Sequence, residues 1–493
     1  GTNRINIYVV RQATEGLAKL IETKGEDVKK RGVAIAYDSR HFSPEFAFES
    51  AQVLAKHGIK AYVFESLRPT PELSFAVRHL GTFAGIMVTA SHNPAPFNGY
   101  KVYGEDGGQM PPADADALTD FIRAIEDPFS IELADLEESK ASGLIEVIGE
   151  NVDAEYLKEV KDVNINQKLI NEYGKDMKIV YTPLHGAGVN LVPASLANFG
   201  FKNVITVKEQ CVLDGNFPTV ASPNPEERKT MQMAIDLAQA QNADLVLATD
   251  PDSDRLGVAL KNEQGEFVAL SGNQVGILLL DYILTRLSEE NAMPNNAAVV
   301  KSFVTTGMAK ALCDDYGVAL YETPVGFKFI GEKIKQWEKD NKHTYVFGFE
   351  ESCGYLRGTH ARDKDAVVAS MLCAEMVCYY TYIGKTVYGR LQEIYQKYGF
   401  VLDKNVSIQY SGLNAMKEMN GVVDGLKNLK VKSLGGLKVD AVRDYSSAKR
   451  VTATGEIESL DIPKCNCVYY ELSGGSFVCV RPSGTEPKLK IYY

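Results

Sequence analysis

Four times along this chain, a run of apolar residues passes directly into a polar loop. The runs GIMV, LVLA, YVFG and FVCV lead into TASHNP (89–94), TDPDSDR (249–255), FEES (349–352) and RPSGTEP (481–487). Short apolar runs of this kind are typical of buried strands, and in open α/β sheets ligands bind beyond the carboxyl ends of the strands. The sequence therefore predicts one cleft to which four strand ends bring polar side chains.

The segments between these loops favour an α/β fold. Strand-like runs at 33–37 and 60–64 flank a helix-like segment at 44–57, an order typical of βαβ units and of a parallel or mixed sheet. The same alternation returns at 178–181 and at 297–301. About the last hundred residues contain short strand-like runs and Gly-rich turns instead, which indicates a smaller α+β domain.

The length agrees with several domains, because 493 residues correspond to roughly three or four units of about 100 to 200 residues. We expect three similar α/β sheet domains and a smaller C-terminal α+β domain around a central cleft. Their predicted extents are 1–165 with the serine loop, 166–275 with the aspartate loop, 276–395 with the glutamate loop, and 396–493 with the arginine loop.

The charge balance restricts the partners. Lys and Arg number 53 against 64 Asp and Glu, so the net charge is −11 and the surface should repel nucleic acid and membranes. The longest apolar stretch, from Val275, meets Asp281 far short of the roughly 20 residues of a membrane span. Eight cysteines without a CxxC pair indicate reduced thiols. We therefore expect a cytoplasmic protein.

The second loop carries three alternating carboxylates, Asp250, Asp252 and Asp254. In an extended segment they project to one side, where they repel one another unless a cation binds, and hard oxygen ligands suit Mg²⁺. An EF-hand is excluded, because Arg255 stands where the sixth loop position needs Gly. The alternative is a solvated acidic turn, which the stiffening Pro251 disfavours.

A phosphate group is the expected companion of such a site, because Mg²⁺ commonly shares phosphate oxygens with protein carboxylates. Ser91 in the first loop is the candidate carrier. It lacks the GxSxG frame of a hydrolase nucleophile, so it either carries a phosphoryl group or serves as a helix cap or turn residue.

The third and fourth loops offer binding groups. Arg481 and its small, hydroxyl-bearing neighbours suit the capture of a phosphate group, and a plain turn is the alternative. Glu350, Glu351 and Ser352 place acceptors beside donors. This composition suits the hydroxyl groups of a sugar, although a surface loop could share it.

Taken in this order, the four loops resemble those of the α-D-phosphohexomutase family. Further similar stretches lie at 181–186, 214–218 and 326–330. The resemblance implies an enzyme that interconverts glucose 1-phosphate and glucose 6-phosphate through a phosphoserine and glucose 1,6-bisphosphate. It also implies Mg²⁺ as the cofactor and a monomer or homodimer as the assembly. Mannose and pentose phosphates are the alternative substrates of the same family.

The resemblance assigns roles to individual residues. The implied metal ligands are Ser91, Asp250, Asp252 and Asp254. The implied catalytic residues are Ser91 as phosphoryl carrier, His92, Lys101, and Lys364 as proton-transfer group. The implied substrate-binding residues are Arg255, Gly326, Lys328, Glu350, Ser352, His360, Arg481, Ser483, Gly484, Thr485 and Lys488.

Some positions depart from the family pattern. Phe349 stands where many relatives place Gly, and 353–355 lack the histidine of dual mannose/glucose mutases, which favours glucose. Relatives also extend before Gly1 and after Tyr493, so we expect this chain to be trimmed. A phosphatase, or a sugar-phosphate sensor without turnover, could use the same loops. The intact Ser91 and aspartate triad favour a mutase over the sensor.

Overall fold

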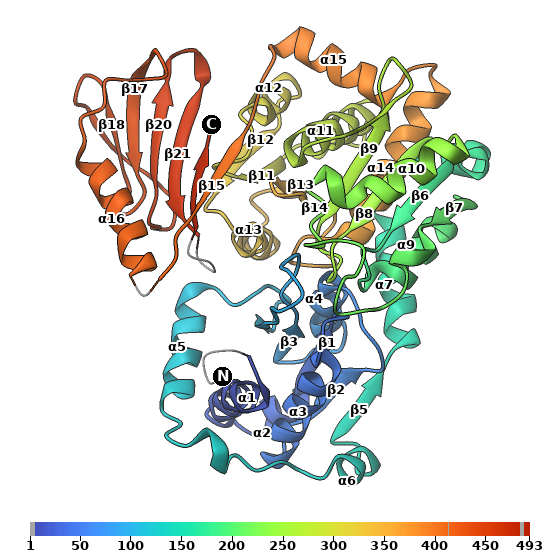
Figure 1. Ribbon diagram of the computed structural model, residues 1–493, viewed down its shortest axis with the longest axis vertical. Coiled ribbons are helices and arrows are strands. Elements are labelled where there is room, and N and C mark those ends of the chain that lie inside the picture. Colours follow the sequence, from blue (N-terminus) through green and yellow to red (C-terminus); the bar gives the residue numbers. More distant parts are fainter. Residues whose placement is uncertain (1–4, 413, 484–487) are drawn as a thin grey trace.

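The structure is a computed structural model that describes residues 5–412, 414–483 and 488–493. The chain forms three mixed sheets with their helices and a fourth, antiparallel sheet near the C-terminus (Figure 1). Each sheet lies within one of the four predicted stretches. The predicted fold class, three α/β domains followed by a smaller β-rich domain, is thereby confirmed.

The first sheet has the strand order β4-β3-β1-β2-β5, with β4 antiparallel to β3 and the other pairs parallel. Val33 and Ile35 pack into one apolar core and the alternating Ala34 and Ala36 into another, so both faces of β1 are covered. Its strands are β1 (Val33–Tyr37), β2 (Ala61–Phe64), β3 (Ala84–Val88), β4 (Tyr100–Gly104) and β5 (Ile145–Ile148). Its helices are α1 (Ile7–Glu22), α2 (Glu26–Arg31), α3 (Ser43–Lys56), α4 (Thr70–His79), α5 (Pro112–Arg123) and α6 (Leu136–Ala141).

The second sheet repeats this plan in the order β10-β9-β8-β6-β7. Its two parallel pairs join β6 to β7 and to β8, and β9 turns back antiparallel to β8. Its strands are β6 (Lys178–Thr182), β7 (Asn203–Thr206), β8 (Leu245–Thr249), β9 (Leu256–Lys261) and β10 (Phe267–Ala269). Its helices, with those that lead into it, are α7 (Glu150–Asp162), α8 (Gln167–Tyr173), α9 (Gly188–Phe199) and α10 (Gln232–Gln241).

The third sheet is shorter, with the order β12-β11-β13-β14, and β14 is again antiparallel to the strand before it. Its strands are β11 (Ala297–Ser302), β12 (Ala319–Thr323), β13 (Thr344–Glu350) and β14 (Gly354–Leu356). Its helices are α11 (Gly272–Glu289), α12 (Met308–Asp315), α13 (Phe327–Asp340), α14 (Ala366–Tyr382) and α15 (Val387–Tyr398). The domain boundary predicted between 275 and 276 falls inside α11, and the four extents stay predictions.

The fourth sheet is antiparallel throughout, and α16 (Ala415–Asn428) packs on it. It joins the third domain through Phe303 and Tyr445, whose rings stack 4.2 Å apart, and through Arg443 and Glu322, 3.2 Å apart. Its strands are β15 (Asn405–Gln409), β16 (Ser433–Leu434), β17 (Leu437–Asp444), β18 (Lys449–Thr452), β19 (Ile457–Ser459), β20 (Val468–Leu472), β21 (Phe477–Pro482) and β22 (Lys488–Tyr492).

One connection recurs in all four sheets. The strands β3, β8, β13 and β21 are each followed by an antiparallel partner, β4, β9, β14 and β22. Each of the four polar loops is the link between such a pair. Each apolar run followed by a polar loop in the sequence therefore corresponds to the first strand of an antiparallel pair and its connection to the second strand.

Among the described residues, no single helix is long and apolar enough to cross a membrane. The helices α14 and α15 meet that criterion of length and composition only as a pair, and they are bent by 86° relative to each other.

The unusual Phe349 is accommodated by a glycine on α11. The ring is fully buried, and a Cβ atom on Gly276 would lie only 2.2 Å from its Cδ2 atom. A second glycine of the same helix, Gly272, lies against the carbonyl of Glu351. The helix thus approaches the end of β13 as closely as its backbone permits, and this approach positions the glutamate loop.

We expect Gly276→Ala to lower the free energy of unfolding by about 1–3 kcal/mol, because overpacking a closed core costs this much. Phe349→Leu in the same chain should recover part of the loss by removing the ring that the new methyl group meets. Urea unfolding of the two single variants and the double variant measures the coupling. Strictly additive effects would show that the two residues do not share one packing site.

Candidate active site

The serine and aspartate loops meet directly. Ser91, just beyond β3, donates a hydrogen bond from Oγ to Oδ2 of Asp250, just beyond β8, at 2.7 Å. Its backbone φ is 49°, in the left-handed region that serine seldom adopts. The backbone N–H of Ser91 donates to Oγ1 of Thr89 at 2.8 Å, and Nδ1 of His92 lies 3.2 Å from Ser91 Oγ. Burial, followed by the charge of Arg255, lowers the pKa of His92.

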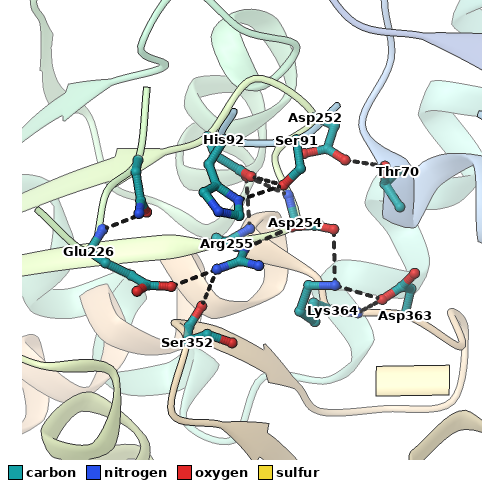
Figure 2. Close-up of polar contacts among 12 residues, drawn as sticks. Thr70, Ser91, His92, Glu226, Asp252, Asp254, Arg255, Ser352, Asp363 and Lys364 are labelled. Atoms are coloured by element: carbon teal, nitrogen blue, oxygen red, sulfur yellow. Dashed lines mark hydrogen bonds and ion pairs between the residues drawn. The ribbon is translucent and has the colours of Figure 1, made fainter. Parts of the chain in front are cut away.

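The three aspartates form a buried cluster, of which Figure 2 labels Asp252 and Asp254. Ligand atoms of Asp250, Asp252 and Asp254 lie within 4.8 Å of one another, and each residue is at most 1% exposed. One oxygen of Asp250 accepts from the backbone N–H groups of Asp254 and Arg255, at 3.1 and 3.0 Å. Oδ2 of Asp252 accepts from Oγ1 of Thr70 at 3.0 Å. The predicted triad is thus assembled on one side of the loop.

This cluster fits a divalent cation. Oδ1 of Asp252 and Oδ1 of Asp254 are buried and have no hydrogen-bond partner among the described residues, a costly state for a carboxylate. Burial and like-charged neighbours raise the pKa of Asp250 and Asp254. At Asp252 burial raises the pKa, but the charges of Lys101 and Lys364 and the hydrogen bonds together outweigh this effect, and the pKa falls. An all-oxygen site with unused lone pairs is what Mg²⁺ or a similar ion requires.

Cationic side chains surround the cluster. Lys101 on β4 lies 3.1 Å from Asp252, and Lys364 lies 3.0 Å from Asp254 and 3.1 Å from Asp363. Burial lowers the pKa of Lys364, but the attraction of both carboxylates is larger and raises it. These pairs bring residues of the first and third domains to the aspartate loop.

Arg255 connects the aspartate loop to the glutamate loop. Its guanidinium donates to Oε1 of Glu226 at 2.5 Å and to the carbonyl of Ser352 at 3.2 Å (Figure 2). Glu350, at the end of β13, is 4% exposed and accepts from the backbone N–H of Gly326 at 2.7 Å. Burial, reinforced by Glu351, raises the pKa of Glu350 to about 7.

Two predicted substrate-binding residues lie apart from this group. The imidazole of His360 is buried, and its Nε2 lies 2.9 Å from Oδ2 of Asp365, the residue that caps α14. His360 therefore supports the start of this helix in the structure described here. Lys328 is half-buried and lies over the ring of Phe329, where it lines a cavity of about 710 Å³.

The fourth domain carries a basic hairpin formed by β21 and β22. Arg481 on β21 donates to the hydroxyl of Tyr492 at 3.1 Å, and the Ser483 N–H donates to the Lys488 carbonyl at 2.7 Å. The predicted Gly484 and Thr485 lie outside the described residues.

Lys490 is a residue that the sequence reasoning missed. It pairs with Arg481 across β21 and β22, so both side chains share one face of the sheet. Burial and then Arg481 lower its pKa, and its charge also acts on His92. The alternation of side chains along a strand could have identified it, because Lys490 stands two residues beyond Lys488.

Three stretches outside the main loops support the site. A Cβ atom on Gly186 would lie 2.4 Å from the Pro251 backbone, and one on Gly215 would lie 2.6 Å from the His41 backbone nitrogen. Thr70 donates from its backbone N–H to the Asp252 carbonyl at 2.8 Å, in addition to its side-chain contact. These close approaches support the aspartate and serine loops. Gly186 and Gly215 belong to the stretches 181–186 and 214–218 that resemble the family, but the sequence alone gave these stretches no role.

The sequence matches models of known domains in three places. These are alpha/beta/alpha domains I, II and III of phosphoglucomutase/phosphomannomutase, and they match residues 1–128, 154–265 and 271–398. The phosphoglucomutase of Staphylococcus haemolyticus is 36% identical over 494 residues, which cover 100% of this chain and 87% of that protein. The chain belongs to the phosphoglucomutase/phosphomannomutase family. The predicted family resemblance is confirmed.

A second relative is similar in sequence, and two solved structures are similar in fold. The phosphoglucomutase of Staphylococcus aureus strain USA300 is 35% identical over 494 residues and covers 100% of this chain and 86% of its own. A putative phosphomannomutase from Thermus thermophilus shares the fold, with a TM-score of 0.71 at 22% identity, over 99% of this chain and 92% of its own. Pp63/parafusin from Paramecium also has a TM-score of 0.71, at 17% identity, over 98% and 86% of the two chains.

We expect Mg²⁺ to stabilise the metal-free protein, because an ion that binds only the folded state adds about 2.7 kcal/mol at a hundredfold excess over its Kd. Asp254→Asn should abolish this gain while leaving the metal-free protein at least as stable, since it removes one of three repelling charges. Thermal unfolding with and without MgCl₂ measures both effects. Asp116→Asn, on the exposed face of α5, is the control. An undiminished Mg²⁺ effect in Asp254→Asn would place the ion elsewhere.

Proposed function

We propose that this family member is a Mg²⁺-dependent phosphoglucomutase, with Ser91 as its phosphoryl carrier. The hydrogen bond from Ser91 Oγ into a buried, incompletely satisfied aspartate triad is the observation that carries the proposal. Relatives at 35–36% identity over the whole chain bear the name phosphoglucomutase, which supports the choice of glucose.

In the proposed reaction, the phosphoryl group on Ser91 passes to the free 6-hydroxyl of glucose 1-phosphate. The bond between phosphorus and Ser91 Oγ breaks as the bond to the sugar oxygen forms, and the hydroxyl proton leaves. Lys364, paired with Asp254 and Asp363, is the group that we assign to proton transfer: its ammonium passes a proton to one of these carboxylates as it takes the proton of the hydroxyl. The resulting 1,6-bisphosphate turns over in the cleft, its 1-phosphoryl group returns to Ser91, and glucose 6-phosphate is released.

The surrounding residues bind and orient the reactants. A divalent cation held by Asp250, Asp252 and Asp254 would neutralise charge on the transferring phosphoryl group. Arg481 and Lys490 face each other as like charges, and a phosphate dianion between them would remove that repulsion. We assign them to the phosphate group that does not react, together with the predicted Ser483, Gly484, Thr485 and Lys488. Glu350 and Ser352 are assigned to the sugar hydroxyls.

Other parts of the proposal rest on the sequence and its resemblance. They are the preference for glucose over mannose or pentose phosphates, the cytoplasmic location, and the monomeric or homodimeric state. Comparison of kcat/KM for the three sugar phosphates tests the first of these. Gel filtration with light scattering tests the last.

Ser91→Ala is expected to lower mutase activity at least about a thousandfold, because the phosphoryl group then has no carrier. Production of glucose 6-phosphate from glucose 1-phosphate, with a trace of glucose 1,6-bisphosphate, measures the loss. Intact-mass analysis should show one phosphoryl group on the wild type and none on the variant. Ser288→Ala, on the exposed end of α11, is the control. Full activity in Ser91→Ala would refute the proposal, and phosphate release that matches substrate loss would indicate a phosphatase.

The affinity for sugar phosphate should depend on pH through Glu350. Its pKa is raised to about 7 by burial, so the carboxylate that accepts sugar hydroxyls is present above pH 7 and is protonated below it. We expect KM to rise about tenfold between pH 8 and pH 6, since one pH unit below the pKa leaves about a tenth of the group ionised.

Glu350→Gln is the control for this effect, because the phosphate group of the substrate titrates in the same range. The variant should have a high KM at both pH values and a flatter profile than the wild type. Identical profiles for the two proteins would show that another group governs the pH dependence.

A further inference from the structure

A single buried guanidinium holds the loop that carries Ser91. Arg40 is 1% exposed and lies between β1 and α3. One terminal nitrogen donates to the carbonyls of Pro94 and Phe97, at 3.0 and 2.9 Å. The other donates to the carbonyls of Ser91 and Asn93, both at 2.5 Å. Four carbonyl groups of one loop thus converge on one side chain.

Arg40 is itself fixed in place. Its Nε lies 3.1 Å from Oδ2 of Asp38, and both side chains are fully buried. The same Asp38 oxygen accepts from Oγ1 of Thr89 at 2.7 Å, and that hydroxyl accepts from the N–H of Ser91. On the other side, the guanidinium lies 4.9 Å from the ring centroid of Phe217, a residue of the second domain. Contacts from two domains therefore determine where Arg40 points.

The loop depends on this support because it has little structure of its own. Residues 89–99 link β3 to β4 without a helix or strand, and Ser91 has a left-handed backbone. Buried carbonyl groups need partners. Only arginine offers several N–H donors in one rigid plane, whereas lysine offers three donors from one point.

We propose that Arg40 is the positioning residue of the Ser91 nucleophile. By binding the four carbonyls, it keeps Ser91 Oγ directed at Asp250, where the phosphoryl group is exchanged. The side chain is buried and both terminal nitrogens donate to carbonyls of the loop, so Arg40 acts through the loop and not on the substrate. The inference rests on the proposed function for its catalytic consequence, but the support of the loop is independent of it.

The test compares Arg40→Lys with a matched control, Arg357→Lys. Arg357 also donates to two backbone carbonyls, those of Val163 and Val346, at 3.0 and 3.3 Å, but on segments remote from Ser91. Steady-state kinetics give kcat and KM for glucose 1-phosphate. Hydrogen exchange followed by mass spectrometry gives the protection of residues 91–97.

We expect Arg40→Lys to lower kcat about a hundredfold, the effect of misplacing a reacting group by about 1 Å. KM should change less than about threefold, because the groups that bind sugar and phosphate are untouched. Amides of 91–97 should exchange at least about tenfold faster, while those of β1 and β3 keep their protection. Arg357→Lys should keep kcat within about threefold and leave the exchange of 91–97 unchanged.

Unchanged exchange of 91–97 in Arg40→Lys would overturn the proposal, whatever the wild-type activity. Faster exchange with full kcat, or an equal loss of kcat in Arg357→Lys, would also overturn it. If Arg40→Lys does not fold, Asp38→Asn tests the proposal in its place, because this variant removes the carboxylate that orients Arg40. Asp38→Asn should show the same fall in kcat, and full kcat would reject the role. A wild type without mutase turnover would refute the proposed function alone.

Discussion

Mutual repulsion among three buried carboxylates is the constraint on which the site depends. Asp250, Asp252 and Asp254 lie within 4.8 Å of one another and are almost inaccessible to solvent. Such a cluster persists only where positive charge and hydrogen-bond donors offset its cost. Lys101 comes from the first domain and Lys364 from the third. The aspartate loop of the second domain is thus paired with a lysine from the first domain and a lysine from the third domain.

The same pair of antiparallel strands positions a polar loop in each domain. A strand of each sheet is followed by an antiparallel neighbour, and predicted site residues such as Ser91, Asp250 and Glu350 lie at the end of that strand or just beyond it. Because both ends of such a loop are tied into a sheet, its backbone can hold strained conformations. Ser91 has a φ of 49° and Ser253 has a φ of 51°, both in the left-handed region. Rigid flanking strands are what permit these conformations.

A second layer of residues controls the positions of these loops. Arg40 gathers the carbonyls of the serine loop, and Gly276 permits the close approach of α11 to Phe349 at the end of β13. Neither residue has a chemical role that a motif would reveal. Net negative charge is likewise compatible with an anionic substrate, since Arg481 and Lys490 concentrate positive charge on one hairpin.

The sequence by itself determined the fold class, the four polar loops and the residue types of the aspartate and serine loops, because strand periodicity and short-range chemistry are local properties. The tertiary structure alone decided which side chains meet. It directs His360 at Asp365, opposes Lys490 to Arg481, and brings Arg40 to the serine loop. These pairings depend on strand register and on domain packing, which join residues far apart in the chain, and no local pattern encodes such distances.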